Sequence, residues 1–381
     1  MNARRGGVAG LVLAGGMARR MGACKVLLPV AGCGALEQLV SRMRAGGVGR
    51  IVVVTGGYAD RTRAEALRLG CTPAHNPDYE TGMFSSVLAG VRALPPDADA
   101  FFLIPGDTPL VKPATYRMLI DAFDAPPDDE APDAVHPEFC GERGHPPLIR
   151  GELAAKVLSW GGMDGMRGFL EAHAPRRRTV AVADRAVLLD MDTPEDYETL
   201  QRYAQTEWYP DPGECAALWD IAGTPVKVRA HMRAVASCAE RVAGALVERG
   251  CTLNVPMLAS AALLHDIAKG SPEHERVGAR YLDKAGYEQV AQLVAAHTDL
   301  PGGLGPEDSP PNEAELLYLC DKLLDGTAFL TPEARMEQME ARFPAGSTAR
   351  NAARARLHKA AVLRDRVEAL LGSTLTEALA T

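Results

Sequence analysis

Two kinds of hydrophobic pattern divide the chain. Through about residue 205, short apolar runs alternate with longer segments of helical periodicity. The apolar runs, which predict buried strands, are residues 8–13, 51–55 and 101–104, with a weaker run at 179–182. The helical segments include residues 36–45, 62–69 and 85–94. This alternation predicts an α/β domain with a parallel sheet, whose ligands bind beyond the carboxyl ends of the strands.

The second half of the chain has a different pattern. From residue 226 to residue 371 the periodicity is almost entirely helical, which predicts an all-α bundle. Between the two halves, the sequence YPDPG at residues 209–213 is typical of a turn or linker. We therefore predict a first domain of residues 1–205, a linker of residues 206–222 and a helical domain of residues 223–381.

Composition narrows the class of protein. The net charge of −8 argues against general nucleic-acid binding, and 47% hydrophobic residues suffice for two packed cores. The eight cysteines include no C-x-x-C pair, which favours reduced thiols over a disulfide framework. No apolar stretch approaches the ~20 residues of a membrane helix, and the apolar run near the start is too short for a signal peptide. We expect a cytoplasmic protein that binds neither nucleic acid nor membrane.

The first apolar run leads into a candidate phosphate-binding loop. Gly15 and Gly16 permit a tight turn after the predicted strand, and the cations Arg20 and Lys25 follow closely. Backbone amides and clustered positive charges of this kind can hold a triphosphate. The spacing is neither that of a P-loop nor that of a dinucleotide-binding turn. The alternative is an ordinary strand–turn–helix with exposed arginines.

Two carboxylates occupy comparable positions later in the first half. Asp107 follows the apolar run FFLIPG, so it should face the ligand crevice, where it would suit Mg²⁺. Its alternative role is to stabilise a turn or cap a helix. Asp192 precedes Thr-Pro in the stretch LLDMDTPEDY, where it could cap a helix that begins with proline.

The loop sequence L-A-G-G-x-x-x-R-M-G-x-x-K-x-L-L-P closely resembles the signature of the molybdenum cofactor cytidylyl- and guanylyltransferases. Similar loops occur in sugar-phosphate nucleotidyltransferases. The resemblance implies a Rossmann-like nucleotidyltransferase domain with a mixed, mainly parallel sheet. It also implies that Arg20 and Lys25 neutralise the triphosphate and the charge on the α-phosphate. The residues that would hold the base and ribose are Leu13, Ala14, Gly15 and Gly16.

Other stretches carry the same resemblance. Asn76 and Ser85 match a family element that lies near the nucleotide, and Arg143 and His145 match an R-G-H-P element near the acceptor phosphate. The family's metal site implies Mg²⁺ on Asp107. Its D-x-D-T-P-E-D-Y element implies a second ligand, for which Asp192 is the first choice and Asp190 the reserve.

The implied reaction is nucleotidyl transfer. A phosphate oxygen of molybdopterin attacks the α-phosphate of a nucleoside triphosphate and pyrophosphate leaves, so positioning and charge neutralisation dominate catalysis. We prefer CTP, because the G-M-x-x-S, R-G-H-P and D-T-P-E-D-Y elements resemble the cytidylyl version. GTP is the alternative, because the L-A-G-G turn resembles the guanylyl version. The expected partners are the nucleotide, molybdopterin and a molybdoenzyme or its chaperone. The alternative acceptor is a sugar, polyol or isoprenoid phosphate.

The helical half contains a second set of candidate ligands. His231, the adjacent pair His265 and Asp266, and Asp321 lie on three predicted helices that can converge on one divalent metal. Imidazole and carboxylate together suit Fe, Mn, Zn or Ni. Adjacent residues of an unbroken helix point about 100° apart, so the pair should stand at a helix end or kink. A lone His-Asp pair, in contrast, would more simply be a surface hydrogen bond.

The ordered set H…HD…D resembles the HD-domain metal-dependent phosphohydrolases. That resemblance implies a divalent metal such as Mn, Fe, Ni, Co or Zn, which activates water for attack on a phosphate ester or nucleotide. It also implies a catalytic, phosphate-binding role for Lys269, and makes His274 and His297 candidates for a second metal or for phosphate. The alternative is a nucleotide-sensing or dimerising module. The Ala- and Arg-rich stretch 347–371 predicts a solvated or packing helix.

Overall fold

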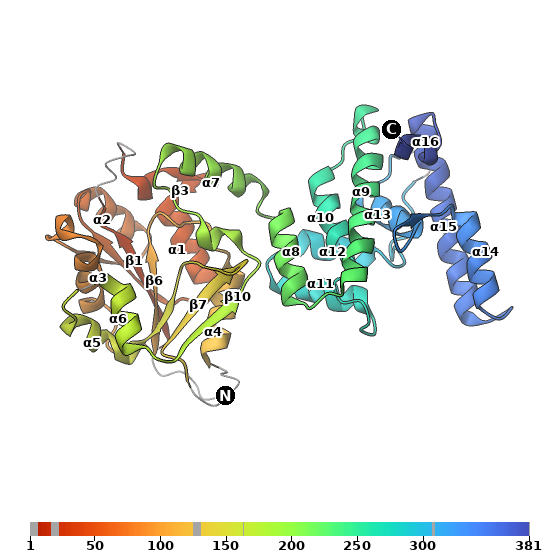
Figure 1. Ribbon diagram of the computed structural model, residues 1–381. Helices are drawn as coiled ribbons and strands as arrows, with labels where there is room; N and C mark the ends of the chain where they lie inside the picture. Colours follow the sequence, from red (N-terminus) through yellow and green to blue (C-terminus); the bar gives the residue numbers. More distant parts are fainter. Residues whose placement is uncertain (1–6, 17–22, 125–130, 163, 307–308, 381) are drawn as a thin grey trace. The chain divides into compact units, whose positions relative to one another are not determined.

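The computed structural model describes residues 7–16, 23–124, 131–162, 164–306 and 309–380 (Figure 1). The chain forms two compact units, Met1–Glu207 and Trp208–Thr381, and each is described here by itself. Arg20 lies outside the described residues. Within the described part of the chain, no helix combines the length and apolarity needed to cross a membrane.

The first unit is built on an eight-stranded sheet of order β10-β7-β9-β6-β1-β4-β5, with β8 paired to the side of β7. The strands are β1 (Val8–Ala14), β4 (Arg50–Thr55), β5 (Thr72–His75), β6 (Ala100–Pro105), β7 (Ala134–Phe139), β8 (Glu142–Arg143), β9 (Leu148–Arg150) and β10 (Arg177–Ala181). Strand β9 runs antiparallel to β6 and β7, β8 is antiparallel to β7, and the other pairs are parallel. The prediction of a mixed, mainly parallel sheet is confirmed.

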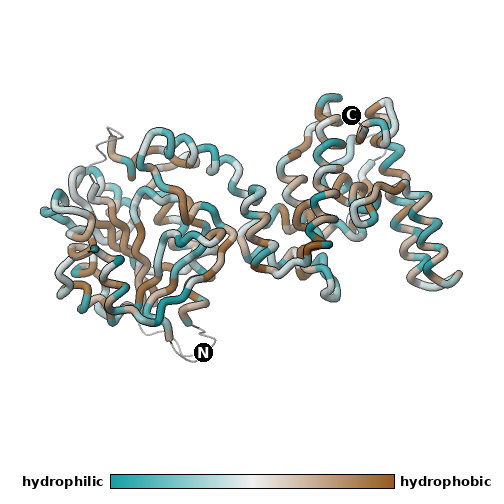
Figure 2. The backbone as a smooth tube through the Cα atoms, in the orientation of Figure 1, coloured by the Kyte–Doolittle hydropathy of each residue, from teal (hydrophilic) through white to brown (hydrophobic). Residues whose placement is uncertain are grey.

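Helices cover both faces of this sheet. They are α1 (Ala35–Ala45), α2 (Ala59–Arg68), α3 (Met83–Arg92), α4 (Pro113–Asp124), α5 (Ala154–Ser159), α6 (Gly165–His173) and α7 (Pro194–Thr206). Successive strand residues point to opposite faces. A Cβ on Gly10 of β1 would therefore meet Met43 of α1, whereas a Cβ on Gly90 of α3 would lie 2.2 Å from Leu11. The strands between these layers are strongly hydrophobic (Figure 2).

The carboxyl ends of β1, β4 and β6 form one rim. Leu13 pairs in register with Pro105, and the amide of Gly106 donates to the carbonyl of Leu13 over 2.9 Å. On the other side of β1, a Cβ on Gly56 would stand 2.3 Å from the carbonyl oxygen of Gly15. Only glycine permits this approach, so the first turn lies directly against the turn after β4. The short helix η1 (Lys25–Leu27) and a hairpin of β2 (Pro29–Val30) and β3 (Cys33–Gly34) follow the first turn.

The second unit is a helical bundle. Its helices are α8 (Pro212–Ile221), α9 (Val226–Glu248), α10 (Val255–Leu264), α11 (His274–Lys284), α12 (Glu288–Ala296), α13 (Glu313–Lys322), α14 (Pro332–Arg342), α15 (Thr348–Leu371) and α16 (Leu375–Ala380). Buried aliphatic residues of α9, α10, α12 and α13 form its core. The predicted helical bundle is confirmed, with one addition: a two-stranded hairpin, β11 (Leu324–Asp325) and β12 (Ala328–Phe329).

The region predicted as a linker is largely helical. Helix α7 continues to Thr206, and α8 begins where Asp211 and Glu214 form a capping box around Pro212. Trp219 of α8 is buried and its indole donates to the carbonyl of Leu263 over 2.7 Å. Residues 212–221 therefore pack within the second unit, and the division of the chain falls after residue 207.

Candidate nucleotide and metal sites

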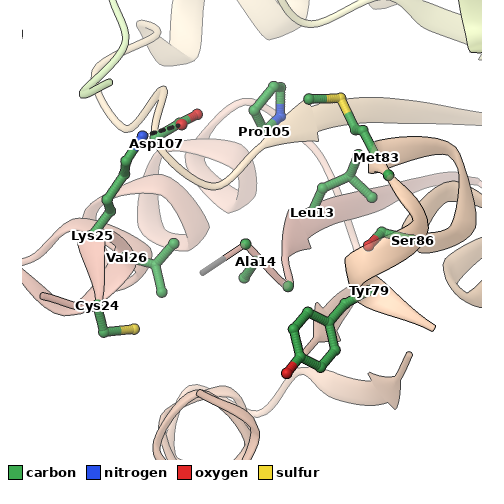
Figure 3. Close-up of a pocket in the computed structure, with 13 residues that line it drawn as sticks. Leu13, Ala14, Cys24, Lys25, Val26, Tyr79, Met83, Ser86, Pro105 and Asp107 are labelled. Carbon is green, nitrogen blue, oxygen red and sulfur yellow. Dashed lines mark hydrogen bonds and ion pairs between the residues drawn. The ribbon is translucent and has the colours of Figure 1, made fainter. Parts of the chain in front are cut away.

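Three charged side chains meet at the rim of the sheet. Lys25 stands at the start of η1, and its ammonium lies 3.5 Å from Oδ2 of Asp107 (Figure 3). The same ammonium lies 2.6 Å from Oδ1 of Asp192. Asp107 follows β6, and Asp192 precedes α7. The structure thus brings together residues separated by more than 160 positions, and two carboxylates converge on one cationic centre. Hard oxygen donors in this arrangement fit Mg²⁺.

A cavity of about 240 Å³ opens beside Lys25 (Figure 3). Its lining includes the predicted residues Leu13, Ala14, Gly15, Gly16, Lys25 and Asp107. Tyr79, Met83 and Ser86 also line it. They belong to the same family element as Asn76 and Ser85, the two residues that the sequence analysis selected from it. The cavity therefore joins the glycine turn to the first turn of α3.

Asn76 and Ser85, the two residues predicted to lie near the nucleotide, belong to one hydrogen-bond network with Ser86. Asn76 is buried, and its amide donates to the hydroxyls of Ser85 and Ser86 over 2.9 and 3.0 Å. Ser85 donates to the carbonyls of Asp78 and Gly82. Neither Asn76 nor Ser85 is among the residues that line the cavity. Both hold the start of α3 in place, and the neighbouring Ser86 faces the cavity instead.

The predicted acceptor residues occupy the segment after β7. Arg143 lies on the exposed strand β8, and the backbone amide of His145 donates to the carbonyl of Val187 over 2.8 Å. His145 keeps an exposed surface, but the chain packed around its ring partly desolvates it and lowers its pKa, while the nearby carboxylate of Asp107 opposes this shift. Partial burial, together with Asp192 and Asp107, raises the pKa of Asp190. His145 and Asp190 thus lie within electrostatic reach of the carboxylates at the rim.

In the second unit, the four predicted metal ligands converge. His231 comes from α9, His265 and Asp266 follow the end of α10 at Leu264, and Asp321 lies on α13. Oδ1 of Asp321 is 3.1 Å from Nε2 of His231 and 3.4 Å from Nε2 of His265. Oδ2 of Asp266 is 3.7 Å from Nε2 of His265. The pair stands at a helix end, as the adjacency of its two residues predicts.

Two further histidines border the same cluster. Nε2 of His274 lies 3.1 Å from Oδ1 of Asp266, and Nε2 of His297 lies 3.7 Å from the same oxygen. Among the described residues, two groups have ligand atoms within 4.8 Å of one another: His231 with His265 and Asp321, and His265 with Asp266 and His297. The shared residue His265 places the two groups side by side.

The orientation of the imidazoles fits a metal. The Nδ1 atoms of His265 and His297 lie 2.8 and 2.6 Å from the carbonyl oxygens of Ala262 and Val294. A carbonyl oxygen only accepts hydrogen bonds, so each Nδ1 carries the hydrogen and each neutral ring leaves a lone pair on Nε2. Nε2 of His265 is fully buried and has no hydrogen-bond partner among the described residues. Such an orphaned atom beside two carboxylates suits a divalent cation.

Electrostatics keep both carboxylates ionised. Burial alone would raise the pKa of Asp321, but Lys322 and the nearby His231 and His265 outweigh burial and hold this pKa well below its usual range. Burial is likewise outweighed at Asp266, whose pKa is lowered by the nearby His274 and by the ammonium of Lys269. Ionised carboxylates are the form that binds metal.

A second cavity, of about 470 Å³, contains this cluster. Lys269 lines it, with its ammonium 2.8 Å from Oδ2 of Asp266. The cavity also has a wall from α14 and α15, which includes Arg335, Met339 and Arg356. Sequence reasoning missed this wall, since the Ala- and Arg-rich segment carries no motif.

Comparisons with known proteins agree with the division of the chain into two units. The family model described as "MobA-like NTP transferase domain" matches residues 10–179, and the model described as "HD domain" matches residues 228–325. An HD domain implies divalent-metal binding, and the cluster contains side chains that could serve as ligands.

Three curated relatives match parts of the first half. The molybdenum cofactor cytidylyltransferase of Escherichia coli (strain K12) is 28% identical over 197 residues, which are 51% of this chain and 96% of that enzyme. The molybdenum cofactor guanylyltransferase of Cereibacter sphaeroides is 31% identical over 189 residues, 49% of this chain and 92% of the relative. A bifunctional IPC transferase and DIPP synthase of Rubrobacter xylanophilus is 42% identical over 97 residues, 24% of this chain and 22% of the relative.

Proposed function

Since this chain belongs to the MobA-like NTP transferase domain family and carries an HD domain, we propose that it is a bifunctional enzyme. Its first unit transfers a nucleotidyl group, from CTP in preference to GTP, to molybdopterin and releases pyrophosphate. The observation that carries this proposal is the convergence of Lys25, Asp107 and Asp192 beside the cavity formed by residues 13–16.

Each residue of the first site has a distinct role in this proposal. Lys25 neutralises the negative charge on the α-phosphate, and Arg20, which lies outside the described residues, assists it. Asp107 and Asp192 would hold Mg²⁺, because hard carboxylate oxygens suit this ion. When bound, Mg²⁺ supplies positive charge between phosphate oxygens. The backbone of residues 13–16 holds the base and ribose.

The acceptor binds beside the same rim. Arg143 and His145 contact its phosphate, and the exposure of Arg143 leaves room for a bulky acceptor. The match to an IPC transferase supports a second candidate, in which the acceptor is a sugar, polyol or isoprenoid phosphate. In either case the protein supplies position and charge, which dominate phosphoryl chemistry.

Pyrophosphate release tests the first proposal. The full chain is incubated with Mg²⁺, each nucleoside triphosphate in turn, and either molybdopterin or one alternative phosphorylated acceptor. Lys25→Met should lower the rate ~10²–10³-fold, the usual cost of losing one preorganised charge contact. Lys156→Met is the control, because Lys156 is an exposed residue of α5. Pyrophosphate release that occurs with another acceptor but not with molybdopterin would favour the second candidate. Unchanged rates in Lys25→Met would refute nucleotidyl transfer at this site.

We further propose that the HD domain hydrolyses a phosphate ester or nucleotide. His231, His265, Asp266 and Asp321 would hold a transition metal such as Mn, Fe, Ni, Co or Zn. When bound, the metal activates water for attack on phosphorus. Lys269 lies within reach of the cluster and binds the phosphate of the substrate.

Two histidines extend this second site. His274 and His297 are positioned to hold a second metal or to contact the substrate's phosphate. This role is supported by the position of both Nε2 atoms beside Oδ1 of Asp266.

Metal content and hydrolysis test the second proposal together. The full chain should copurify with, or take up, one or two transition-metal ions and release phosphate from phenyl phosphate. Replacement of both His265 and Asp266 by alanine should abolish both properties. His358→Ala is the control, because His358 is an exposed residue of α15 that does not line the cavity. Metal binding without hydrolysis across a broad panel of phosphate esters would favour a sensing or dimerising module instead.

A further inference from the structure

The HD cavity is completed by residues that lie outside the HD match. The match ends at residue 325, but α14 and α15 come later in the chain and pack side by side in the second unit (Figure 1). The residues that α14 and α15 contribute to the cavity lining are Arg335, Met339, Ala353, Arg356 and Leu357. One continuous cavity is therefore bordered both by the metal ligands and by these two helices.

Most positive charges in the cavity already have partners. Lys269 lies 2.8 Å from Oδ2 of Asp266, and Lys322 is paired with Asp321. Arg335 donates through Nη1 to the carbonyl oxygens of Asp321, Lys322 and Leu324. These cations are therefore paired with the carboxylates of the cluster or bonded to the backbone next to it.

Arg356 differs from these residues. Its Nε is buried and has no hydrogen-bond partner among the residues that the structure describes, while 38% of the side chain stays exposed. The nearest carboxylate oxygen, Oδ1 of Asp299, is 3.7 Å from Nε and is shared with Lys359, whose ammonium lies 3.5 Å away. Two cations thus share one carboxylate, so positive charge remains at the wall of the cavity.

Besides their arginines, α14 and α15 contribute apolar residues to the cavity lining. Leu357 is buried, and Met339, Ala353 and Val228 are partly exposed to the cavity. Outside the metal cluster, Asp325 is the acidic residue among the described lining positions, and it lies on the hairpin rather than on α15. A ligand that reaches α15 therefore meets methylene and methyl groups next to one guanidinium.

We propose that the HD cavity binds a phosphate monoester whose alcohol part has an apolar face and a second negative charge. This inference rests on the proposed function of the HD site and specifies its substrate class. The phosphate lies at the metal cluster, the apolar face contacts Met339 and Leu357, and the second anionic group binds the guanidinium of Arg356. Arginine suits this task because its rigid fork matches a carboxylate or phosphate.

Two non-hydrolysable probes isolate the second charge. Phenylphosphonate and 4-carboxyphenylphosphonate share a ring and a phosphonate, but only the second compound has a carboxylate. Their dissociation constants are measured by calorimetry on the full chain loaded with Mn²⁺. We expect 4-carboxyphenylphosphonate to bind about 10-fold more tightly, since a charge-assisted contact commonly has an effect of this size.

Variants of α15 locate the effect. Arg356→Gln should weaken binding of 4-carboxyphenylphosphonate about 10-fold, to the level of phenylphosphonate, and Arg356→Lys should retain part of the preference. Arg354→Gln is the matched control, because Arg354 lines a separate groove between α14 and α15. Thermal melting of each variant shows whether it is folded.

Three outcomes would overturn the inference: equal affinity for the two probes, no binding of either probe, or an equal loss in Arg356→Gln and Arg354→Gln. Hydrolysis of phenyl phosphate by the same preparation tests the proposed function separately. If the protein hydrolyses phenyl phosphate but binds the two phosphonates equally well, the proposed hydrolytic function stands and only the proposed substrate class is refuted.

Discussion

Nδ1 of His231 lies 2.8 Å from the carbonyl oxygen of Gly326, at the tip of the β11–β12 hairpin. Because the carbonyl accepts, Nδ1 must donate, and Nε2, which lies 3.1 Å from Oδ1 of Asp321, is the nitrogen left to bind a metal once it has lost its proton. The hairpin in turn is held by Arg335 of α14, which bonds to three carbonyl oxygens at the end of α13 and in β11. Arg335, which is not itself a proposed ligand, thus positions His231, which is one.

We predict that Arg335→Gln weakens metal binding. Loss of the arginine frees the hairpin, and outer contacts of this kind typically change metal affinity 10–100-fold. Titration of the metal-free full chain with Mn²⁺ should show a dissociation constant raised by about 10-fold. Arg342→Gln, an exposed arginine on the same helix, should bind Mn²⁺ like the wild type. Equal affinities in Arg335→Gln and the wild type would show that the hairpin holds its place without the arginine.

Removal of metal should lower the thermal stability of the second unit. The four ligands come from α9, the end of α10 and α13, so a bound ion joins three elements of the bundle. A ligand present at 100 times its dissociation constant stabilises the folded state by about 2.7 kcal/mol. We expect a chelator to lower the melting temperature, added Mn²⁺ to restore it, and His265→Ala to melt at the chelated temperature under both conditions. A melting temperature insensitive to chelator and Mn²⁺ would argue against a metal that bridges the helices.

The first turn of the nucleotide cavity depends on a close backbone contact. In Gly56→Ala the new Cβ would stand 2.3 Å from the carbonyl oxygen of Gly15 and 2.8 Å from Cβ of Tyr79, so the glycine turn must shift. Overpacking of this kind usually costs 1–3 kcal/mol. We expect a raised KM for the nucleoside triphosphate and faster hydrogen exchange in β1 and β4. Gly49→Ala, where a Cβ would meet open space, should change neither quantity.

The sequence predicts those parts of the sites in which the type of residue and its position at the end of an element already indicate a chemical role. Lys25, Asp107 and Asp192 are polar groups at strand or helix ends, and in the structure each carboxylate lies within 3.5 Å of the Lys25 ammonium. Arg356, in contrast, lies in a run of alanine and arginine. Which of its arginines faces the cavity depends on how α15 packs against α13 and α14, and periodicity alone does not contain that information.

Local geometry explains two other differences. Ser85 and Ser86 are adjacent near the start of α3, and adjacent helical side chains point about 100° apart, so only one of them faces the cavity. In the predicted linker, a proline-rich stretch concealed a helix start. The start of α8 has a capping signal, formed by Asp211, Pro212 and Glu214. Our prediction gave more weight to the turn-forming character of proline and glycine, and therefore placed a linker here.

His136 provides a pH-dependent prediction for the first unit. It lies in β7, and its Nε2 is buried without a hydrogen-bond partner among the described residues. Burial, and after it the positive charges of Arg143, Arg177 and His145, lower its pKa from 6.5 to about 4. Thr179 of β10 is its paired neighbour in the sheet and offers no charge to oppose this shift.

The sign of the effect follows from proton binding. Between pH 6.5 and 4 the unfolded chain protonates this histidine while the folded chain does not, so protons favour the unfolded state. The free energy of unfolding is therefore unaffected by this histidine above about pH 6.5, and it decreases as the pH falls from 6.5 toward 4. One pKa unit corresponds to about 1.4 kcal/mol, and the partial exposure of the ring reduces the total to roughly 1–3 kcal/mol.

Hydrogen exchange of peptides that cover β7, measured in the full chain at pH 7 and pH 5, tests this prediction. The free energies of opening of β7 are corrected for the intrinsic pH dependence of exchange. Between pH 7 and pH 5 they should decrease in the wild type and decrease less in His136→Gln. His75→Gln, which replaces an exposed histidine of the same unit, controls for the substitution. If the wild type and His136→Gln lose the same opening free energy, the buried imidazole is not the group that couples this sheet to pH.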